Sequence, residues 1–118
     1  MIDWDRVAEL RSDMGAEDFL EVVALFLAEV QEAADRLSRS PAPERLEGEL
    51  HFIKGSAYNL GFEALGALCT SGERMAAAGS AADVDVAAIL ACYAQSRREF
   101  LAGLDSLGGK DGLGAVSK

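Results

Sequence analysis

The chain is poor in cysteine, and it has no long apolar run. Its two cysteines, Cys69 and Cys92, lack the spacing of a zinc knuckle and are too few for a disulfide framework, so we expect both to be buried apolar side chains. No apolar run approaches the roughly 20 residues that cross a bilayer, and residues 1–5 lack the basic and apolar segments of a secretion signal. We therefore expect a cytoplasmic protein with no membrane partner.

Positive charge is also scarce. The 118 residues include 11 Lys and Arg against 20 Asp and Glu, which gives a formal net charge of -9, and the basic residues form no block. Such a chain repels the phosphates of nucleic acids, so we expect no nucleic-acid partner. The length is that of one ordinary domain, and a hydrophobic content of 50% is enough for one core.

Apolar residues recur at helical spacing through most of the chain, and no stretch alternates apolar and polar residues as a strand would. The spacing predicts helices over residues 4–14, 19–37, 43–60, 62–79 and 86–107. Gly15 and Gly61 are suited to end the first and third of these, Pro43 to begin the third, and Ser80 or Asp83 to cap the fifth. The predicted buried side of the fourth helix consists of Leu65, Leu68, Cys69 and Met75.

These elements predict an all-α fold. Because short connections make successive helices antiparallel neighbours, we expect residues 1–107 to form an up-down-up-down four-helix bundle with a short extra N-terminal helix. Residues 108–118 contain four glycines and little that is apolar, which favours a flexible C-terminal tail.

His51 is the only histidine, and its position on the third predicted helix is informative. At about 100° per residue, its side chain points roughly 140° away from the apolar seam of that helix, so it should face outward. Gly48 and Gly55 lie one turn to either side of it, although each glycine costs a helix about 1 kcal/mol. They would leave the imidazole open to a large partner. The alternative is that they permit tight packing between helices.

Two further side chains belong with this histidine. Lys54, one turn later, can reach the space above the ring and offset the charge of a phosphate, unless it is an ordinary solvated lysine. Glu73 follows the Gly61 break by about as many residues as His51 precedes it, so the two should sit at similar heights on antiparallel helices. A hydrogen bond from one ring nitrogen to Glu73 would orient the ring and leave the other nitrogen free to attack. The alternative is a surface carboxylate that pairs with Arg74 or water.

Residues 51–61, HFIKGSAYNLG, resemble the signature of histidine-containing phosphotransfer (HPt) domains: His, two residues, Lys-Gly, small residues and then Leu-Gly. The resemblance covers the whole chain and extends to Glu73, where the family commonly places Glu or Gln, although Ser71 and Gly72 depart from the Leu-Glu often found there. It implies a phosphorelay intermediate that accepts a phosphoryl group on His51 from a receiver-domain aspartyl phosphate and passes it to another receiver. By this resemblance the chain has no kinase activity and no cofactor of its own, because the receivers of hybrid histidine kinases and response regulators supply Mg²⁺. We expect a monomer.

Three other interpretations fit the sequence less well. The dimerisation hairpin of a sensor kinase is disfavoured because Phe52 and Ile53, rather than an acidic residue, follow the histidine. A helical adaptor that binds signalling partners without phosphotransfer is disfavoured by the presence of Lys54 and Gly55 beside His51. A metal site lacks ligands, since no second ligand except Glu47 lies one helical turn away.

Overall fold

A computed structural model describes residues 1–39 and 42–110 of the chain. It consists of α1 (Trp4–Met14), α2 (Ala16–Ser38), α3 (Pro43–Leu60), α4 (Glu63–Ala77), the short 3-10 helix η1 (Ala81–Asp83) and α5 (Val86–Lys110). The only strand-like pairing in this part of the chain is an isolated bridge between Ile2 and Phe62. The predicted all-α fold class is confirmed.

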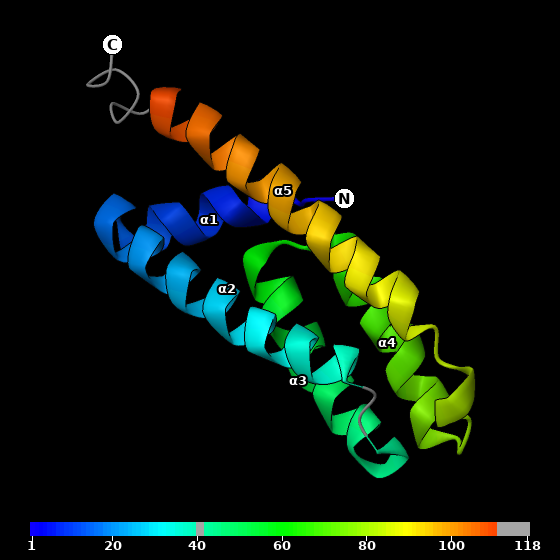
Figure 1. Ribbon diagram of the computed structural model, residues 1–118. Helices are drawn as coiled ribbons and strands as arrows, with labels where there is room; N and C mark the ends of the chain where they lie inside the picture. The colour runs from blue at the N-terminus through cyan, green and yellow to red at the C-terminus, as the bar shows by residue number, and fades with distance from the viewer. Residues whose placement is uncertain (40–41, 111–118) are drawn as a thin grey trace.

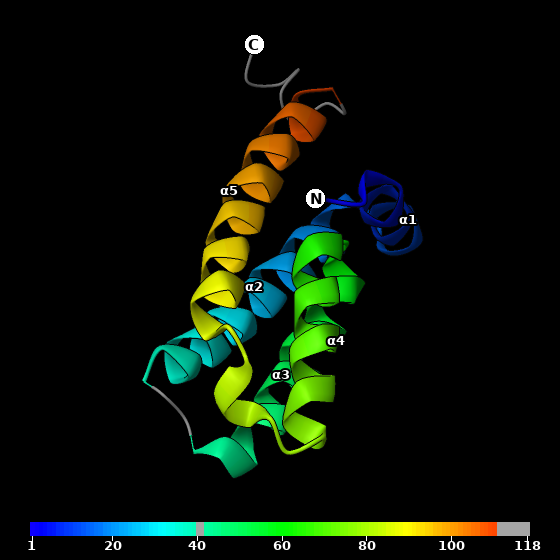
Figure 2. The same ribbon diagram turned by 90° about the vertical axis from the view of Figure 1, so that its right-hand side faces the viewer.

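The helices of the bundle contact one another in a ring. α2 packs on α3, α3 on α4, α4 on α5, and α5 back on α2 (Figure 1). That is the arrangement of an antiparallel up-down-up-down bundle, and α3 and α4 form its most extensive contact. α1 crosses one end, beside the turn that joins α3 to α4 (Figure 2). No helix within the described residues has the length and apolarity needed to cross a membrane.

The turn between α3 and α4 is fixed by Gly61. Its φ of 83° lies in the left-handed region, where glycine has no steric penalty, and its carbonyl accepts a hydrogen bond of 2.7 Å from the N–H of Asp3. A side chain at residue 61 would come within 2.7 Å of the Asp3 carbonyl oxygen. The N-terminal segment therefore holds the end of the α3–α4 hairpin in place.

The core is apolar and continuous through all the helices. Phe62 packs edge-on against Phe100, and Trp4 stacks on the same ring from α1. Gly103 leaves the space on α5 that the Trp4 ring occupies. The larger side chains that are almost fully buried are Val7, Phe19, Val30, Leu37, Leu50, Ile53, Leu60, Phe62, Leu65, Cys69 and Phe100. Both cysteines are buried and free, as the sequence predicted, and burial raises the pKa of Cys69 to about 12.

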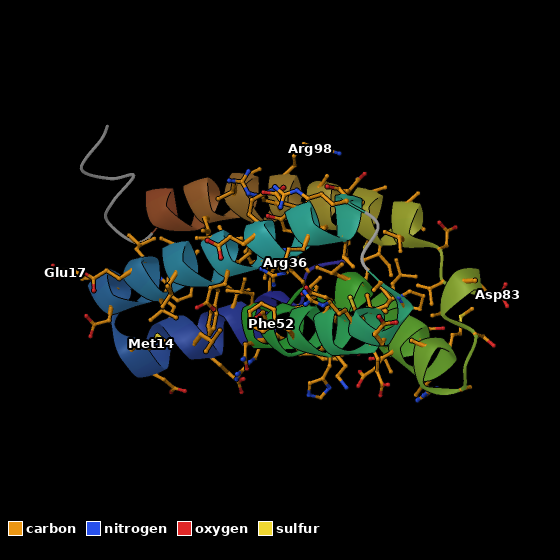
Figure 3. The ribbon with its side chains drawn as sticks, turned by 60° about the horizontal axis from the view of Figure 1, so that its bottom comes forward. Met14, Glu17, Arg36, Phe52, Asp83 and Arg98 are labelled. Atoms are coloured by element: carbon orange, nitrogen blue, oxygen red, sulfur yellow. The ribbon has the colours of Figure 1, made fainter. Side chains whose placement is uncertain are left out.

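α2 and α3 are also joined by an ion pair at their outer edge. The guanidinium of Arg36, a residue that Figure 3 labels on α2, donates two hydrogen bonds, of 2.6 and 2.9 Å, to the carboxylate of Glu49. This carboxylate raises the pKa of Arg36 above its ordinary value. The pair is bidentate, which fixes its geometry more firmly than a single contact would.

Two details of the predicted helices are wrong, and one boundary differs. Leu68 is 38% exposed and Met75 is only half-buried, because the bundle covers a narrower strip of α4 than its apolar residues suggest. The cap of α5 is Asp85, whose side chain accepts from the N–H of Ala88 at 3.0 Å, whereas the predicted Ser80 and Asp83 belong to the preceding η1 turn. α5 also runs to Lys110, three residues beyond the predicted end of the bundle, and residues 111–118 of the predicted tail lie outside the described residues.

Candidate functional site

His51 lies on the outer side of α3, as the helical wheel predicts. Its side chain is 68% exposed, while Leu50 beside it is fully buried in the core. Its Nδ1 is 2.9 Å from Oε2 of Glu73 on α4. The sequence therefore places the ring where a partner can reach it, and the neighbouring helix provides a hydrogen-bond acceptor.

The contact between His51 and Glu73 follows from the register of the α3–α4 hairpin. Gly61 reverses the chain between the two helices, so residues at similar distances from the turn face each other. Glu73 is only 19% exposed, because its carboxylate lies against α3 instead of extending into solvent. It does not take the surface role of the alternative interpretation, in which it would pair with Arg74 or water.

Lys54 completes the cluster in a way that the sequence did not indicate. Its ammonium group forms an ion pair with Glu73, 2.7 Å from the buried Oε1 of that carboxylate. The hydrogen bond from Lys54, followed by the one from His51, lowers the pKa of Glu73 against the opposing effect of burial. The carboxylate is therefore ionised at neutral pH, with one oxygen directed to each partner.

Because Glu73 is ionised, it can only accept hydrogen bonds. The ring of His51 must then carry its proton on Nδ1 when it is neutral, since Nδ1 is the atom that faces the carboxylate. Nε2 keeps its lone pair and makes no hydrogen bond among the described residues. The arrangement presents one nucleophilic nitrogen, in a fixed orientation, to the outside of the bundle.

Gly48 and Gly55 border the ring in the way that the clearance interpretation requires. A Cβ atom built on either glycine meets no atom within 4 Å outside its own helix. Neither glycine therefore permits a close helix contact, which was the alternative explanation. The space they leave open lies outside the molecule.

Two glycines of α4 have a packing role that the sequence did not reveal. A Cβ at Gly66 of α4 would lie 2.6 Å from the ring of Tyr58, and one at Gly72 would lie 2.9 Å from Leu50, so these glycines do permit close packing of α3 on α4. Glycine in the middle of the fourth helix was the available signal. Its meaning depended on knowing which residues of α3 lie opposite.

The cluster at His51 consists of one imidazole, one carboxylate and one ammonium group. Within the described residues, no three His, Cys, Asp or Glu side chains are close enough together to hold a metal ion. What the cluster does provide is a nucleophile, an acceptor that orients it, and a cation that holds the acceptor. These parts suit the transfer of a group to and from an exposed imidazole.

Comparisons with known proteins support this interpretation. The family model of the Hpt domain matches residues 21–105, which include α3, α4 and the cluster described above. Searches of curated proteins and of solved structures found no match. Because the family model covers well over half of the chain, the chain belongs to the Hpt domain family, whose members carry phosphoryl groups on histidine in two-component phosphorelays.

Proposed function

We propose that the chain is a phosphorelay intermediate that receives a phosphoryl group on Nε2 of His51 from the aspartyl phosphate of one receiver domain and donates it to the aspartate of another. The observation that carries this proposal is the geometry of the imidazole. Its ring is 68% exposed, its Nδ1 is held 2.9 Å from Glu73, and its Nε2 is directed away from that carboxylate.

The transfer balances without an additional base. The lone pair of Nε2 attacks phosphorus, a P–N bond forms, and the P–O bond to the receiver's aspartate breaks and leaves a carboxylate. The ring keeps its proton on Nδ1 and becomes a phosphorylated imidazolium, whose positive charge lies 2.9 Å from the Glu73 carboxylate. The reverse steps, with a second receiver, return the ring to its neutral form. Glu73 thus orients the nucleophile and stabilises the charge that develops on it.

The rest of the transfer machinery would belong to the partner. Receivers contribute an acidic pocket and Mg²⁺, which place the phosphoryl group and neutralise its charge. The open space beside Gly48 and Gly55 would let such a pocket close over the ring. On this proposal the chain needs no cofactor and has no kinase activity, and a monomeric, cytoplasmic protein remains our expectation.

The test is transfer from a purified receiver domain that has been phosphorylated on its aspartate. We expect wild-type chain to acquire an acid-labile, alkali-stable phosphate and His51→Gln to acquire none. Glu47→Gln is a matched control, because this exposed residue lies one turn before His51 on the same helix. Label that persists in His51→Gln would overturn the assignment. If a panel of the host's receivers leaves the wild type unlabelled, the chain is an adaptor without phosphotransfer.

A further inference from the structure

Tyr58 is an exposed aromatic residue that the described contacts hold in one position. Its side chain is 46% exposed, yet its ring lies over Gly66 of α4, where even a methyl group would come within 2.6 Å of it. Its hydroxyl group lies 3.4 Å from Oγ1 of Thr70, and this oxygen donates its own proton to the Gly66 carbonyl at 2.8 Å. Tyr58 is therefore the donor to Thr70, and its lone pairs remain available to another molecule.

Tyr58 lies on the same face of the molecule as His51. The two residues are seven positions apart on α3, which is nearly two full turns and about 10.5 Å along the axis. Both are bonded to α4, His51 to Glu73 and Tyr58 to Thr70. The contacts Tyr58–Gly66 and His51–Glu73 thus both join α3 to α4, at two heights along the same antiparallel hairpin.

On this face, two residues of α3 lie between the rings, Lys54, whose side chain reaches across to Glu73, and Gly55, which has no side chain. A Cβ atom at Gly55 would meet only open space. A partner can therefore follow the backbone of α3 closely from one ring to the other. We call His51, Gly55 and Tyr58 the reactive strip.

The size of a protein interface decides whether a partner at His51 also covers Tyr58. Even a transient contact of about 500 Å² on each partner corresponds to a disc of roughly 13 Å radius, which exceeds the separation of about 10.5 Å. Tyrosine is enriched among the residues that contribute most to binding, because it offers a large ring and a polar tip with little entropy to lose. Here the contacts with Gly66 and Thr70 restrict the ring before any partner arrives.

We propose that Tyr58, seated on Gly66 and Thr70, is a specificity-determining residue for the receiver domain that exchanges phosphate with His51. This proposal rests on the proposed function, since it concerns the partner of the same site. The ring contacts an apolar side chain of the receiver. The hydroxyl oxygen accepts a hydrogen bond from a separate donor group of the receiver. Tyr58 takes no part in the chemical step.

The experiment separates docking from chemistry by the use of two phosphate donors. A phosphorylated receiver must dock on the reactive strip, whereas phosphoramidate, a small donor, needs access to His51 only. For Tyr58→Ala we expect the KM for the receiver to rise about tenfold or more, with kcat and the rate of labelling by phosphoramidate within about twofold of wild type. The receiver KM of Tyr58→Phe should lie between those of wild type and Tyr58→Ala, since this variant keeps the ring and loses the hydroxyl oxygen that accepts a hydrogen bond.

Gly66→Ala tests the seat itself. Its added methyl group displaces the ring of Tyr58, so its KM should rise as in Tyr58→Ala, and the double variant should be no worse than either single one. Leu68→Ala is the matched control. Leu68 is an exposed apolar residue of α4, but it lies about 160° around that helix from Thr70 and should leave the KM unchanged.

Two results would overturn the proposal. One is a receiver KM for Tyr58→Ala within twofold of wild type. The other is an equal slowing with the receiver and with phosphoramidate, which would mean that Tyr58 acts on His51 and not on the partner. Failure of the proposed function looks different, because then wild-type chain itself accepts no phosphate from any receiver.

Discussion

Removal of the Glu73 carboxylate is the perturbation that tests the site most directly. Glu73→Ala deletes the acceptor for both His51 and Lys54, which lie 2.9 and 2.7 Å away. A hydrogen bond to a charged group contributes about 1.5–3 kcal/mol, and the exposure of the ring argues for the lower end. If that energy is used to orient and charge-stabilise the imidazole, a loss of about 1.5 kcal/mol corresponds to roughly tenfold slower transfer.

Glu73→Gln should have a smaller effect, for a reason that the geometry supplies. The amide has one acceptor oxygen, so it can accept from His51 or from Lys54 but not from both, and its NH₂ group can only donate. We therefore expect transfer rates in the order wild type, Gln, Ala. Rates of transfer from a phosphorylated receiver, read together with ¹⁵N chemical shifts of the His51 ring, would measure both speed and tautomer. If Glu73→Ala transfers within twofold of wild type and keeps the same tautomer, Glu73 does not orient the ring.

The remaining predictions concern pH, the clearance around the ring and the start of α5. The pKa of Glu73 is lower in the folded protein than in the unfolded chain. The ionised carboxylate therefore contributes fully to the free energy of unfolding above the ordinary Glu pKa of about 4.3, and this contribution is lost as the pH falls through the lowered pKa of the folded protein. The difference in Tm between wild type and Glu73→Gln should therefore narrow in acid, and a difference that is constant down to about pH 2 would contradict this. Gly55→Ala should stabilise the fold by about 0.5–1 kcal/mol, and Gly55→Arg should leave the fold intact while it slows transfer from a receiver. An unchanged transfer rate in Gly55→Arg would mean that the open space beside His51 is not needed by the receiver. Asp85→Ala should lower the free energy of unfolding in urea by about 1 kcal/mol, whereas Asp83→Ala should leave it unchanged. Equal losses would place the cap elsewhere.

Sequence reasoning reaches furthest where a residue's effect is local. Pro43 and Gly61 determine where α3 begins and ends through their own backbone restrictions, and the structure has the helix at those positions. The same reasoning failed at the start of α5. Ser80 and Asp83 are good capping residues, but a short 3-10 turn intervenes, and Asp85 is the residue that reaches the first free N–H groups. Several residues of one segment can cap a helix, and tertiary packing selects among them.

For the site, the sequence could place side chains on a face but could not say how far a flexible one reaches. A helical wheel and a count from Gly61 bring His51 and Glu73 together, because both depend on regular geometry alone. The sequence correctly predicts that Lys54 lies on the same side of α3 as His51. Its ammonium group, however, pairs with Glu73 and does not extend into the space above the ring. The choice among the rotamers of a four-carbon chain depends on the partner that is present, and this partner comes from another helix.

The four helical glycines beside the site fall into two groups that the sequence cannot distinguish. Gly66 and Gly72 each leave room for a side chain of α3, so their cost in helix propensity is offset by packing inside the molecule. Gly48 and Gly55 have the same cost, about 1 kcal/mol each, and a side chain there would meet nothing. Within the described residues, no neighbouring side chain occupies the space beside Gly48 or Gly55. That space lies on the side of α3 that carries His51, so on the proposed function it is where a receiver would place its aspartate.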